Sequence, residues 1–419
     1  MALPDLSSVV APNNVGAVSK LLSEVAAAGD VFSNTGGASL VPRRELLAKA
    51  RELTHALETP REIMIQHIWA QAKHQPSNMM AISFGVQSGL WTAMANNGDG
   101  PQKVVDLSKQ LGMQEELLKR IMRHIAASGY IDMTAPDEYT PNNFSKSLVL
   151  PVMSGSYYTA APVLYPTFLS TYNWLQNSGY VCPTDNLDTP YQVAHDTKLH
   201  FFSHMQSNPI HGRNFSECMH GYSLGRPEWM DEAFYPVKER LVNGFDTSNK
   251  DAVLLIDIAG GFGHYTEAFL SKFPDAPGRL IVQDLPPVLK QNKQLNPRIE
   301  KMEYDFFTEQ PVKGARTYYT HFVLHDWPDE EAIKIAMRVK EAMKPGYSKF
   351  LLHEHVVPPM NPDYEQTTLD LIMLTCLAGK ERSLSQWSEL LEKRCGLRIV
   401  KIWTPINGIE SVIECELPE

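Results

Sequence analysis

The sequence has few cysteines, no long apolar run and no excess of basic residues. Its 5 cysteines among 419 residues are scattered, without the C-x-x-C spacing of a zinc site. The same scatter excludes a disulfide framework and indicates a reducing compartment. No apolar run reaches the roughly 18–20 residues that cross a bilayer, and the first residues lack the basic flank of a signal peptide. We therefore expect a cytoplasmic protein that has no membrane partner.

The charge balance is acidic, with 38 basic residues, 48 acidic residues and a formal net charge of −10. Domains that bind nucleic acid carry an excess of basic residues, so this balance argues against DNA or RNA as a partner. Hydrophobic residues make up 43% and charged residues 21% of the chain, as in soluble globular proteins. A length of 419 residues indicates two or three domains.

Residues 1–150 are predicted to form an all-helical and winged-helix domain. Three short helices followed by a hairpin have the rhythm of a winged helix. Winged helices commonly bind DNA, but the third helix mixes charges and the chain is acidic, so we interpret this domain as a packing and dimerisation module of a homodimer. The predicted elements are helices at 15–28, 42–57, 82–95, 104–111 and 114–127, and a hairpin over 130–141.

Residues 151–245 are rich in aromatic residues and methionine. We predict a helical region that links the two outer domains and lines a substrate pocket. Such residues at helical spacing are usually core, although aromatic and methionine surfaces also suit flat apolar ligands. The sequence leaves open which of these side chains take which role.

In residues 246–419, apolar strands alternate with helices, which is the pattern of a doubly wound α/β sheet. An antiparallel strand is expected at its end. Ligands of such sheets bind beyond the carboxyl ends of the strands. The predicted strands are 253–257, 280–283, 300–304, 317–324 and 349–355, with a final pair near 397–404 and 410–416.

The most informative segment follows the first of these strands, where an apolar run ends at Asp257 and the glycines Gly260, Gly261 and Gly263 come next. A buried strand, a tight turn and a helix have this pattern, and glycine lets a ligand approach the backbone closely. A P-loop is excluded because no Gly-Lys-Ser/Thr follows, and the dinucleotide spacing G-x-G-x-x-G fits poorly. An ordinary turn is the simplest alternative to a ligand site.

Polar residues also follow the other strands. Asp284 comes about 20 residues after the glycines, where an acid binds a ribose diol of either NAD or S-adenosylmethionine (SAM). Asp305, His325 and Glu354 sit at or just past later strand ends. A histidine is the natural general base near neutral pH, and Glu354 and Glu381 are both candidates to orient it. On its own, His325 would more simply cap a helix, but this gathering at one rim favours catalysis.

Motifs along nearly the whole chain resemble those of class I SAM-dependent O-methyltransferases of the plant and fungal small-molecule type. The fungal natural-product branch is the most similar, through Thr189-Pro190-Tyr191-Gln192 and the segments 221–227 and 324–329. The resemblance implies a Rossmann-like SAM-binding domain at 246–419, SAM as the cofactor and a small-molecule natural product as the substrate. It implies no metal ion.

The resemblance also implies roles for single residues. His325 would deprotonate the acceptor hydroxyl, with Asp326, Glu354 and Glu381 around it. Asp284 would bind the ribose hydroxyls. The residues implied in SAM binding are Ser223, Asp257, Gly260, Gly261, Gly263, Asp284, Leu285, Asp305, Phe306 and His321.

The chain departs from the family pattern at several positions. Ala259 stands where relatives carry the first glycine of the loop, and His321 stands where relatives carry lysine or arginine. His353 and His355 flank Glu354, but strand alternation should point both of them away from it.

Two enzymatic functions follow from the resemblance. The first is transfer of a methyl group from SAM to a hydroxyl of an aromatic or polyketide-type metabolite. The second is a reaction of the pericyclase or dehydratase type, in which bound SAM keeps its methyl group. The intact His325 favours the first function.

Overall fold

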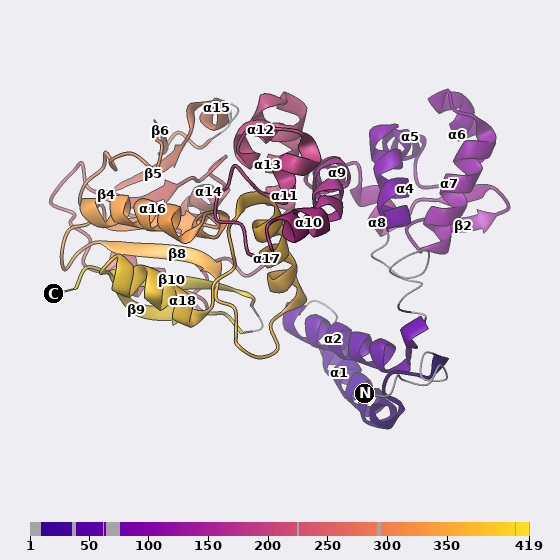
Figure 1. Cartoon of the computed structure of the whole chain (residues 1–419), viewed down its shortest axis with the longest axis horizontal. Helices are drawn as coiled ribbons and strands as arrows, with labels where there is room; N and C mark the ends of the chain where they lie inside the picture. The colour runs from indigo at the N-terminus through magenta and orange to yellow at the C-terminus, as the bar shows by residue number, and fades with distance from the viewer. Residues whose placement is uncertain are drawn as a thin grey trace. The chain divides into compact units, whose positions relative to one another are not determined.

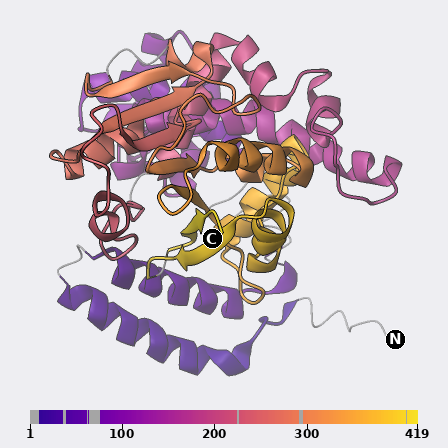
Figure 2. The same ribbon diagram turned by 90° about the vertical axis from the view of Figure 1, so that its left-hand side faces the viewer.

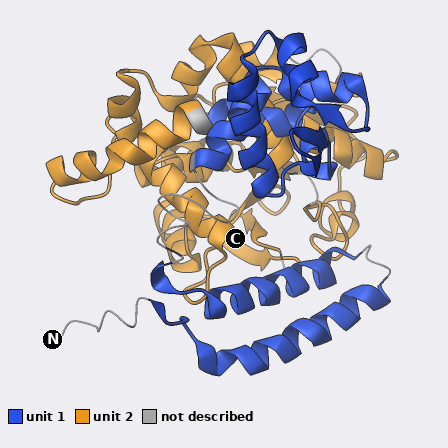
Figure 3. Cartoon of the chain, turned by 90° about the vertical axis from the view of Figure 1, so that its right-hand side faces the viewer, with its two compact units in different colours: residues 1–161 blue, residues 162–419 orange. Residues whose placement is uncertain are grey.

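The computed structural model describes residues 10–35, 39–61, 63, 76–223, 226–290, 295–406 and 408–418, without the side chains of residues 76, 160, 161 and 223. Internal contacts divide the chain into an N-terminal unit, residues 1–161, and a C-terminal unit, residues 162–419 (Figure 3). The three-part division predicted from the sequence stays a prediction. No helix within the described ranges is both long and apolar enough to cross a bilayer.

The N-terminal unit begins with two helices, α1 (Val18–Asn34) and α2 (Leu40–Leu57), which lie side by side (Figures 1 and 2). An ion pair of 3.1 Å joins Glu24 Oε2 to Lys49 Nζ between them. Both helices were expected from the sequence. Apolar side chains of the pair that remain exposed in the single chain include Leu22, Val31, Leu47 and Leu57.

The rest of the N-terminal unit combines further helices with a small antiparallel sheet of order β1-β3-β2. The helix predicted at 82–95 is in fact two helices, because the chain turns at Gly89, whose φ of +78° suits glycine. A third strand, β1, joins the predicted hairpin. The bounds are α4 (Pro76–Gln87), α5 (Leu90–Asn97), β1 (Gln102–Lys103), α6 (Val104–Leu111), α7 (Glu115–Ala127), β2 (Asp132–Ala135), β3 (Glu138–Thr140), α8 (Asn143–Ser147) and α9 (Pro151–Thr159).

The C-terminal unit opens with helices that carry many of the aromatic residues. Tyr191, Phe201 and Met205 are buried in a cluster with Met373 and Leu377 of a later helix, so these side chains are core. Other apolar side chains of the region, such as those of Leu169 and Tyr172, are exposed. The elements are η3 (Ala160–Leu164), which spans the unit boundary, α10 (Tyr165–Asn177), α11 (Pro190–His195), α12 (Phe201–Ser207), α13 (Pro209–Ser223) and η4 (Lys238–Val242).

A seven-stranded sheet of order β6-β5-β4-β7-β8-β10-β9 forms the centre of this unit. The pairs from β6 through β8 are parallel, and β10 is antiparallel to both of its neighbours, as predicted. The strands are β4 (Val253–Ile258), β5 (Arg279–Asp284), β6 (Ile299–Glu303), β7 (Thr317–His321), β8 (Lys349–His355), β9 (Arg398–Trp403) and β10 (Glu410–Glu416).

Helices cover both faces of this sheet, and each face has its own apolar core. Ile256 and Ile258 of β4 belong to the core on the side of α16 and α18, whereas Leu255 belongs to the core that contains α14. Figure 1 shows α16 and α18 lying over the sheet. These helices are α14 (His264–Lys272), α15 (Pro286–Leu289), α16 (Asp329–Ala342), α17 (Tyr364–Leu377), α18 (Leu384–Ser388) and η6 (Glu389–Arg394). The Rossmann-like α/β fold is therefore confirmed.

Candidate active site

The glycine loop follows β4 at the point where the strand order changes direction. From β4 the chain builds β5 and β6 on one side and β7 and β8 on the other, and ligands bind at such a switch point. A Cβ added to Gly260 would lie 2.6 Å from the carboxyl carbon of Asp257, and one added to Gly263 would lie 2.7 Å from Leu295. A Cβ on Gly261 would meet nothing within 4 Å. The loop therefore requires glycine for its own packing and presents its backbone at Gly261.

Two aspartates hold this loop. Asp257 is buried and accepts a hydrogen bond of 2.8 Å from Thr266 Oγ1, and burial raises its pKa to about 7. Asp284, at the end of β5, accepts hydrogen bonds from the amides of Gly261 (2.8 Å) and Leu285 (2.7 Å). Burial raises the pKa of Asp284, although the two amides oppose the shift. Asp284 thus ties the glycine loop to the end of the neighbouring strand.

Asp305 and Phe306 lie just past β6. Asp305 is exposed, and its Oδ1 accepts a hydrogen bond of 2.9 Å from the amide of Phe307. Phe306 is half-buried and meets the ring of Trp327 edge to face, with 5.8 Å between the centroids. Because Trp327 follows His325 closely in the chain, the structure brings Phe306 next to the segment that carries His325.

The other residues predicted to bind SAM lie as follows. The side chain of Leu285 is exposed, and its amide holds Asp284. His321 ends β7, with its Nε2 atom 3.4 Å from Glu410 Oε2. Burial, and secondarily His353, lowers the pKa of His321 to about 4. Ser223 ends α13, and its side chain lies outside the described part of the chain.

His325 is placed by a turn rather than by a strand. The prediction that the strand runs to Leu324 is wrong, because β7 ends at His321 and Phe322 takes a φ of +49°. Residues 324–326 then form the 3₁₀ turn η5. Positive φ is rare for a bulky side chain, and here it directs the ring of Phe322 onto that of His325, at 4.9 Å between centroids and 18° between planes.

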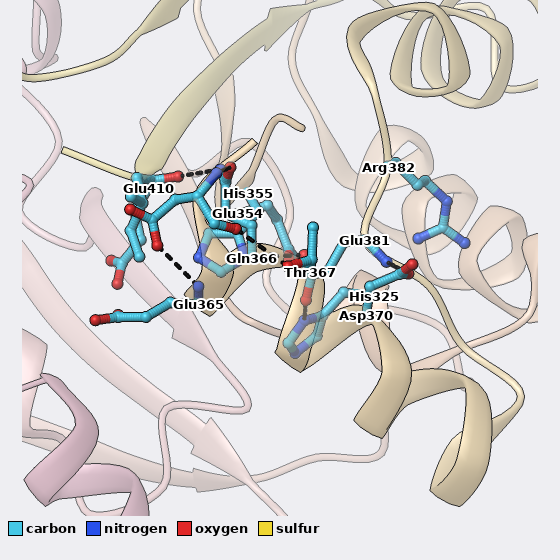
Figure 4. A network of polar contacts seen from close by, with 12 residues as sticks. His325, Glu354, His355, Glu365, Gln366, Thr367, Asp370, Glu381, Arg382 and Glu410 are labelled. Carbon is cyan, nitrogen blue, oxygen red and sulfur yellow. Dashed lines mark hydrogen bonds and ion pairs between the residues drawn. The ribbon is translucent and has the colours of Figure 1, made fainter. Parts of the chain in front are cut away.

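The buried imidazole of His325 lies between two carboxyl groups. Its Nδ1 atom is 2.7 Å from Glu381 Oε1, and its Nε2 atom is 3.3 Å from Asp326 Oδ1. Figure 4 shows His325 beside Glu381, with Glu354 and His355 in the same network. The sequence left Glu354 and Glu381 open as the carboxylate that orients the histidine, and the structure places Glu381 there.

Glu354 holds the turn instead of the imidazole. Its Oε1 atom accepts hydrogen bonds from the amides of Val323 (3.0 Å) and Leu324 (2.9 Å). These are the first amides of the turn that carries His325. Burial raises the pKa of Glu354, which is fully buried. As the alternation of β8 predicts, the neighbours His353 and His355 make their contacts elsewhere.

The carboxylates around His325 dominate its charge. Burial alone would lower the pKa of His325, but Glu381, Asp326 and Glu354 together raise it to about 10. Burial works against ionisation of Glu381 as well, yet the adjacent His325 lowers the pKa of Glu381 to about 2. Burial raises the pKa of Asp326 to about 7. The resting site therefore favours an imidazolium paired with the Glu381 carboxylate.

Segment 379–382 belongs to the site, but the sequence analysis identified only Glu381 in it. A Cβ added to Gly379 would overlap the carbonyl oxygen of His325, so this position requires glycine. Arg382, which is fully buried, donates a hydrogen bond of 2.8 Å to the carbonyl of Leu324. The segment thus clamps the His325 turn through its backbone. In the sequence, only Gly379 and Arg382, close to Glu381, could have indicated this clamp.

Two more residues lie against Glu381. Its amide donates a hydrogen bond of 2.8 Å to Asp370 Oδ1 of α17. Its Oε2 atom lies 3.2 Å from Nδ1 of His355, which is fully buried at the end of β8. No sequence spacing joins these three residues, because they come from different elements that meet only in the folded chain.

Known proteins resemble this chain in both sequence and fold. The O-methyltransferase domain model matches residues 228–397. The O-methyltransferase mfmE of Annulohypoxylon moriforme is 33% identical, over 97% of this chain and 94% of the relative. The structures of LepI in complex with SAM and of a protein described as a pericyclic reaction enzyme each align with a TM-score of 0.83 and 26% identity, over 95% of this chain and 100% of the other. OxaC in complex with SAH and oxaline aligns with a TM-score of 0.82 and 26% identity, over 96% of this chain and 99% of the other.

The chain belongs to the O-methyltransferase family. It is a SAM-dependent enzyme, and SAM is its cofactor. The residues present fit this cofactor, because the glycine loop exposes its backbone at Gly261 and the Asp284 carboxyl stands at the adjoining strand end. A ribose diol suits a carboxylate such as that of Asp284.

Proposed function

We propose that this enzyme methylates a hydroxyl group of an aromatic or polyketide-type small molecule, with His325 as the general base. The observation that carries the proposal is the 2.7 Å contact between His325 Nδ1 and Glu381. A carboxylate that accepts the Nδ1 proton leaves the lone pair on Nε2, the atom that would take the hydroxyl proton. The support of this pair by Glu354 and by segment 379–382 gives the base a fixed direction.

The electrostatics suit a phenol. A phenol has a pKa near 10, so a base whose own pKa is raised to about 10 matches it well. The same shift means that His325 needs to lose its proton before it can act. Bound SAM supplies an electrophilic methyl group on a positively charged sulfur. A positive charge close to His325 lowers its pKa, so we infer that the base is formed in the complex with cofactor.

We assign the cofactor-binding roles on the same grounds. Asp284 binds the ribose hydroxyls, the backbone of the glycine loop and Asp257 hold the methionine part, and Asp305 and Phe306 contact the adenine. The position of Phe306 against Trp327 supports an adenine site next to the catalytic turn. Leu285, Ser223 and His321 remain proposed contacts of the cofactor.

A second function is favoured by one observation. An imidazolium held by Glu381 is a hydrogen-bond donor, which suits a dehydration or a pericyclic reaction in which SAM keeps its methyl group. One of the similar structures is described as a pericyclic reaction enzyme. Methyl transfer remains the first proposal, since the curated relative mfmE is named as an O-methyltransferase.

Detection of S-adenosylhomocysteine separates these functions. The full chain is incubated with SAM and a panel of phenols and polyketide-type alcohols, and both S-adenosylhomocysteine and the organic product are quantified. Equal amounts of methylated product and S-adenosylhomocysteine support methyl transfer. Conversion of a substrate without S-adenosylhomocysteine would overturn it in favour of the second function.

We further propose that residues 1–150, with their winged-helix elements, form the dimerisation domain of a cytoplasmic homodimer. The exposed apolar side chains of α1 and α2, such as Leu22 and Val31, support a partner for this helix pair. Removal of residues 1–75 should give monomers or insoluble protein in sedimentation experiments. A soluble dimer after this deletion would refute the proposal.

A further inference from the structure

Three side chains outside the His325 network converge at the same end of the sheet. His321 ends β7, His353 lies in the adjacent β8, and Glu410 begins β10, which pairs with β8 on its other side. His321 and His353 are register partners. Their ligand-type atoms, one from each side chain, all lie within 4.8 Å of one another. The three residues are far apart in the sequence, and only the strand order brings them together.

Both imidazoles direct Nε2 towards one carboxylate oxygen. His353 Nε2 is 3.0 Å and His321 Nε2 is 3.4 Å from Glu410 Oε2. Despite these distances, neither nitrogen has an aligned hydrogen bond to any partner among the described residues. His353 is fully buried, so its unsatisfied nitrogen cannot turn to bulk water. Each of these nitrogens is therefore available to a further ligand beside the Glu410 carboxylate.

The distances suit ligands of a common ion. Two ligand atoms bound to a tetrahedral Zn²⁺ at about 2.0–2.1 Å lie about 3.3 Å from each other. The two nitrogen–oxygen distances, 3.0 and 3.4 Å, bracket this value. Two histidines and one glutamate are also a known ligand set of zinc with one position open for a further ligand.

The surroundings orient the three ligands. Arg226 Nη1 binds Glu410 Oε1 at 2.7 Å, which leaves Oε2 to face the histidines. Tyr319 OH lies 2.8 Å from His353 Nδ1, and in the tautomer in which Nδ1 donates its proton to Tyr319, Nε2 is free to bind a metal ion. The charge of Arg226 opposes a cation, but Glu365 neutralises it through a 2.8 Å ion pair, so Glu410 keeps its negative charge for the site.

We propose that His321, His353 and Glu410 bind a divalent transition-metal ion of the Zn²⁺ type. The site shares no side chain with the His325–Glu381 pair, which uses a different glutamate. An alternative is a closed polar cluster in which Arg226 alone balances Glu410. A metal site should bind one added ion per chain, whereas a closed polar cluster should bind none.

The test uses metal alone. The full chain, purified without an affinity tag and treated with a chelator, is titrated calorimetrically with Zn²⁺ in the absence of SAM. We expect one ion per chain, and the Co²⁺ form should show the visible absorption of a four-coordinate ion. H321Q and E410Q should each weaken binding by at least about 100-fold, since even loss of an outer partner costs ~10–100-fold.

Matched variants control for binding elsewhere. H204Q removes a histidine that hydrogen-bonds Tyr191 away from the cluster, and C182S removes an exposed thiol. Both should bind Zn²⁺ as the unaltered chain does. If E410Q fails to fold because Arg226 loses its partner, H321Q decides, since His321 is not an internal ion-pair partner of Arg226. Absence of stoichiometric binding, or equally tight binding by H321Q and by the unaltered chain, overturns the proposal.

Discussion

Two histidine–glutamate clusters lie at the same end of one sheet and have opposite electrostatics. At His325, three carboxyl groups surround one imidazole and raise its pKa to about 10. At His321 and His353, two imidazoles share Glu410, which Arg226 already binds, and the pKa of His321 is lowered to about 4, with burial as the main cause. Burial thus lowers the pKa of His321, whereas at His325 the surrounding carboxylates outweigh burial and raise the pKa.

The largest effect is expected for H325Q. Loss of a general base reduces kcat by ~10²–10⁴-fold, whereas SAM binding is retained or strengthened, because His325 is not a proposed cofactor contact and the change removes a positive charge that opposes the sulfonium. Stopped assays with quantified S-adenosylhomocysteine and calorimetric titration with SAM measure the two quantities. As the matched change in the other cluster, H353Q should leave the pH dependence of kcat unmoved. A collapse of SAM binding in H325Q would contradict the division between base and cofactor site.

Two substitutions of Glu354 test whether this residue acts by holding the turn or by its negative charge. E354Q retains an oxygen that accepts the amides of Val323 and Leu324, so we expect nearly unchanged stability, while loss of the negative charge, the smallest of the three carboxylate effects, slightly lowers the pKa of His325. E354A leaves both buried amides without a partner and should cost about 1–3 kcal/mol of unfolding free energy. Thermal unfolding of the two variants measures this difference. Equal stability of E354A and E354Q would show that the carboxyl does not hold the turn.

Gly379 tests how closely segment 379–382 approaches the His325 turn. A Cβ at this position would overlap the His325 carbonyl, so G379A should shift the turn and cost about 1–3 kcal/mol of stability together with activity. Gly346 has positive φ but no atom within 4 Å of an added Cβ, so G346A reports the cost of backbone strain alone. Denaturant unfolding compares them. If G379A is no less stable than G346A, the proposed clamp is wrong.

The smallest change in stability is expected for a substitution in the glycine loop, A259G. Ala259 has a φ of +57°, a conformation that glycine adopts without strain. A259G should change the unfolding free energy by no more than ~1 kcal/mol, because relief of strain is offset by the greater freedom of the unfolded chain. Differential scanning calorimetry measures this change. A large loss of stability would contradict this expectation and would mean that the methyl group of Ala259 makes stabilising packing contacts.

The sequence predicted what depends on local patterns. Buried apolar runs marked the strands, and acids at the strand ends, such as Asp257 and Asp284, marked the rim of the sheet. It misplaced the end of β7, because Phe322 breaks the strand with a positive φ that no residue pattern announces. The cluster of His321, His353 and Glu410 was not predicted, since it depends on which strands are neighbours.

We propose that the Glu381 carboxylate sets the basicity of His325. The direct measurement is the pH dependence of kcat/KM for the unaltered enzyme and for E381Q, with H353Q as the control. The deprotonated base is the active form, so activity rises with pH through the pKa of His325. Removal of the negative charge lowers that pKa. We therefore expect the acid limb of the pH–rate profile of E381Q to move to lower pH, with a reduced maximum rate. An acid limb that stays at the same pH in E381Q would contradict the role of Glu381 in raising the pKa of His325.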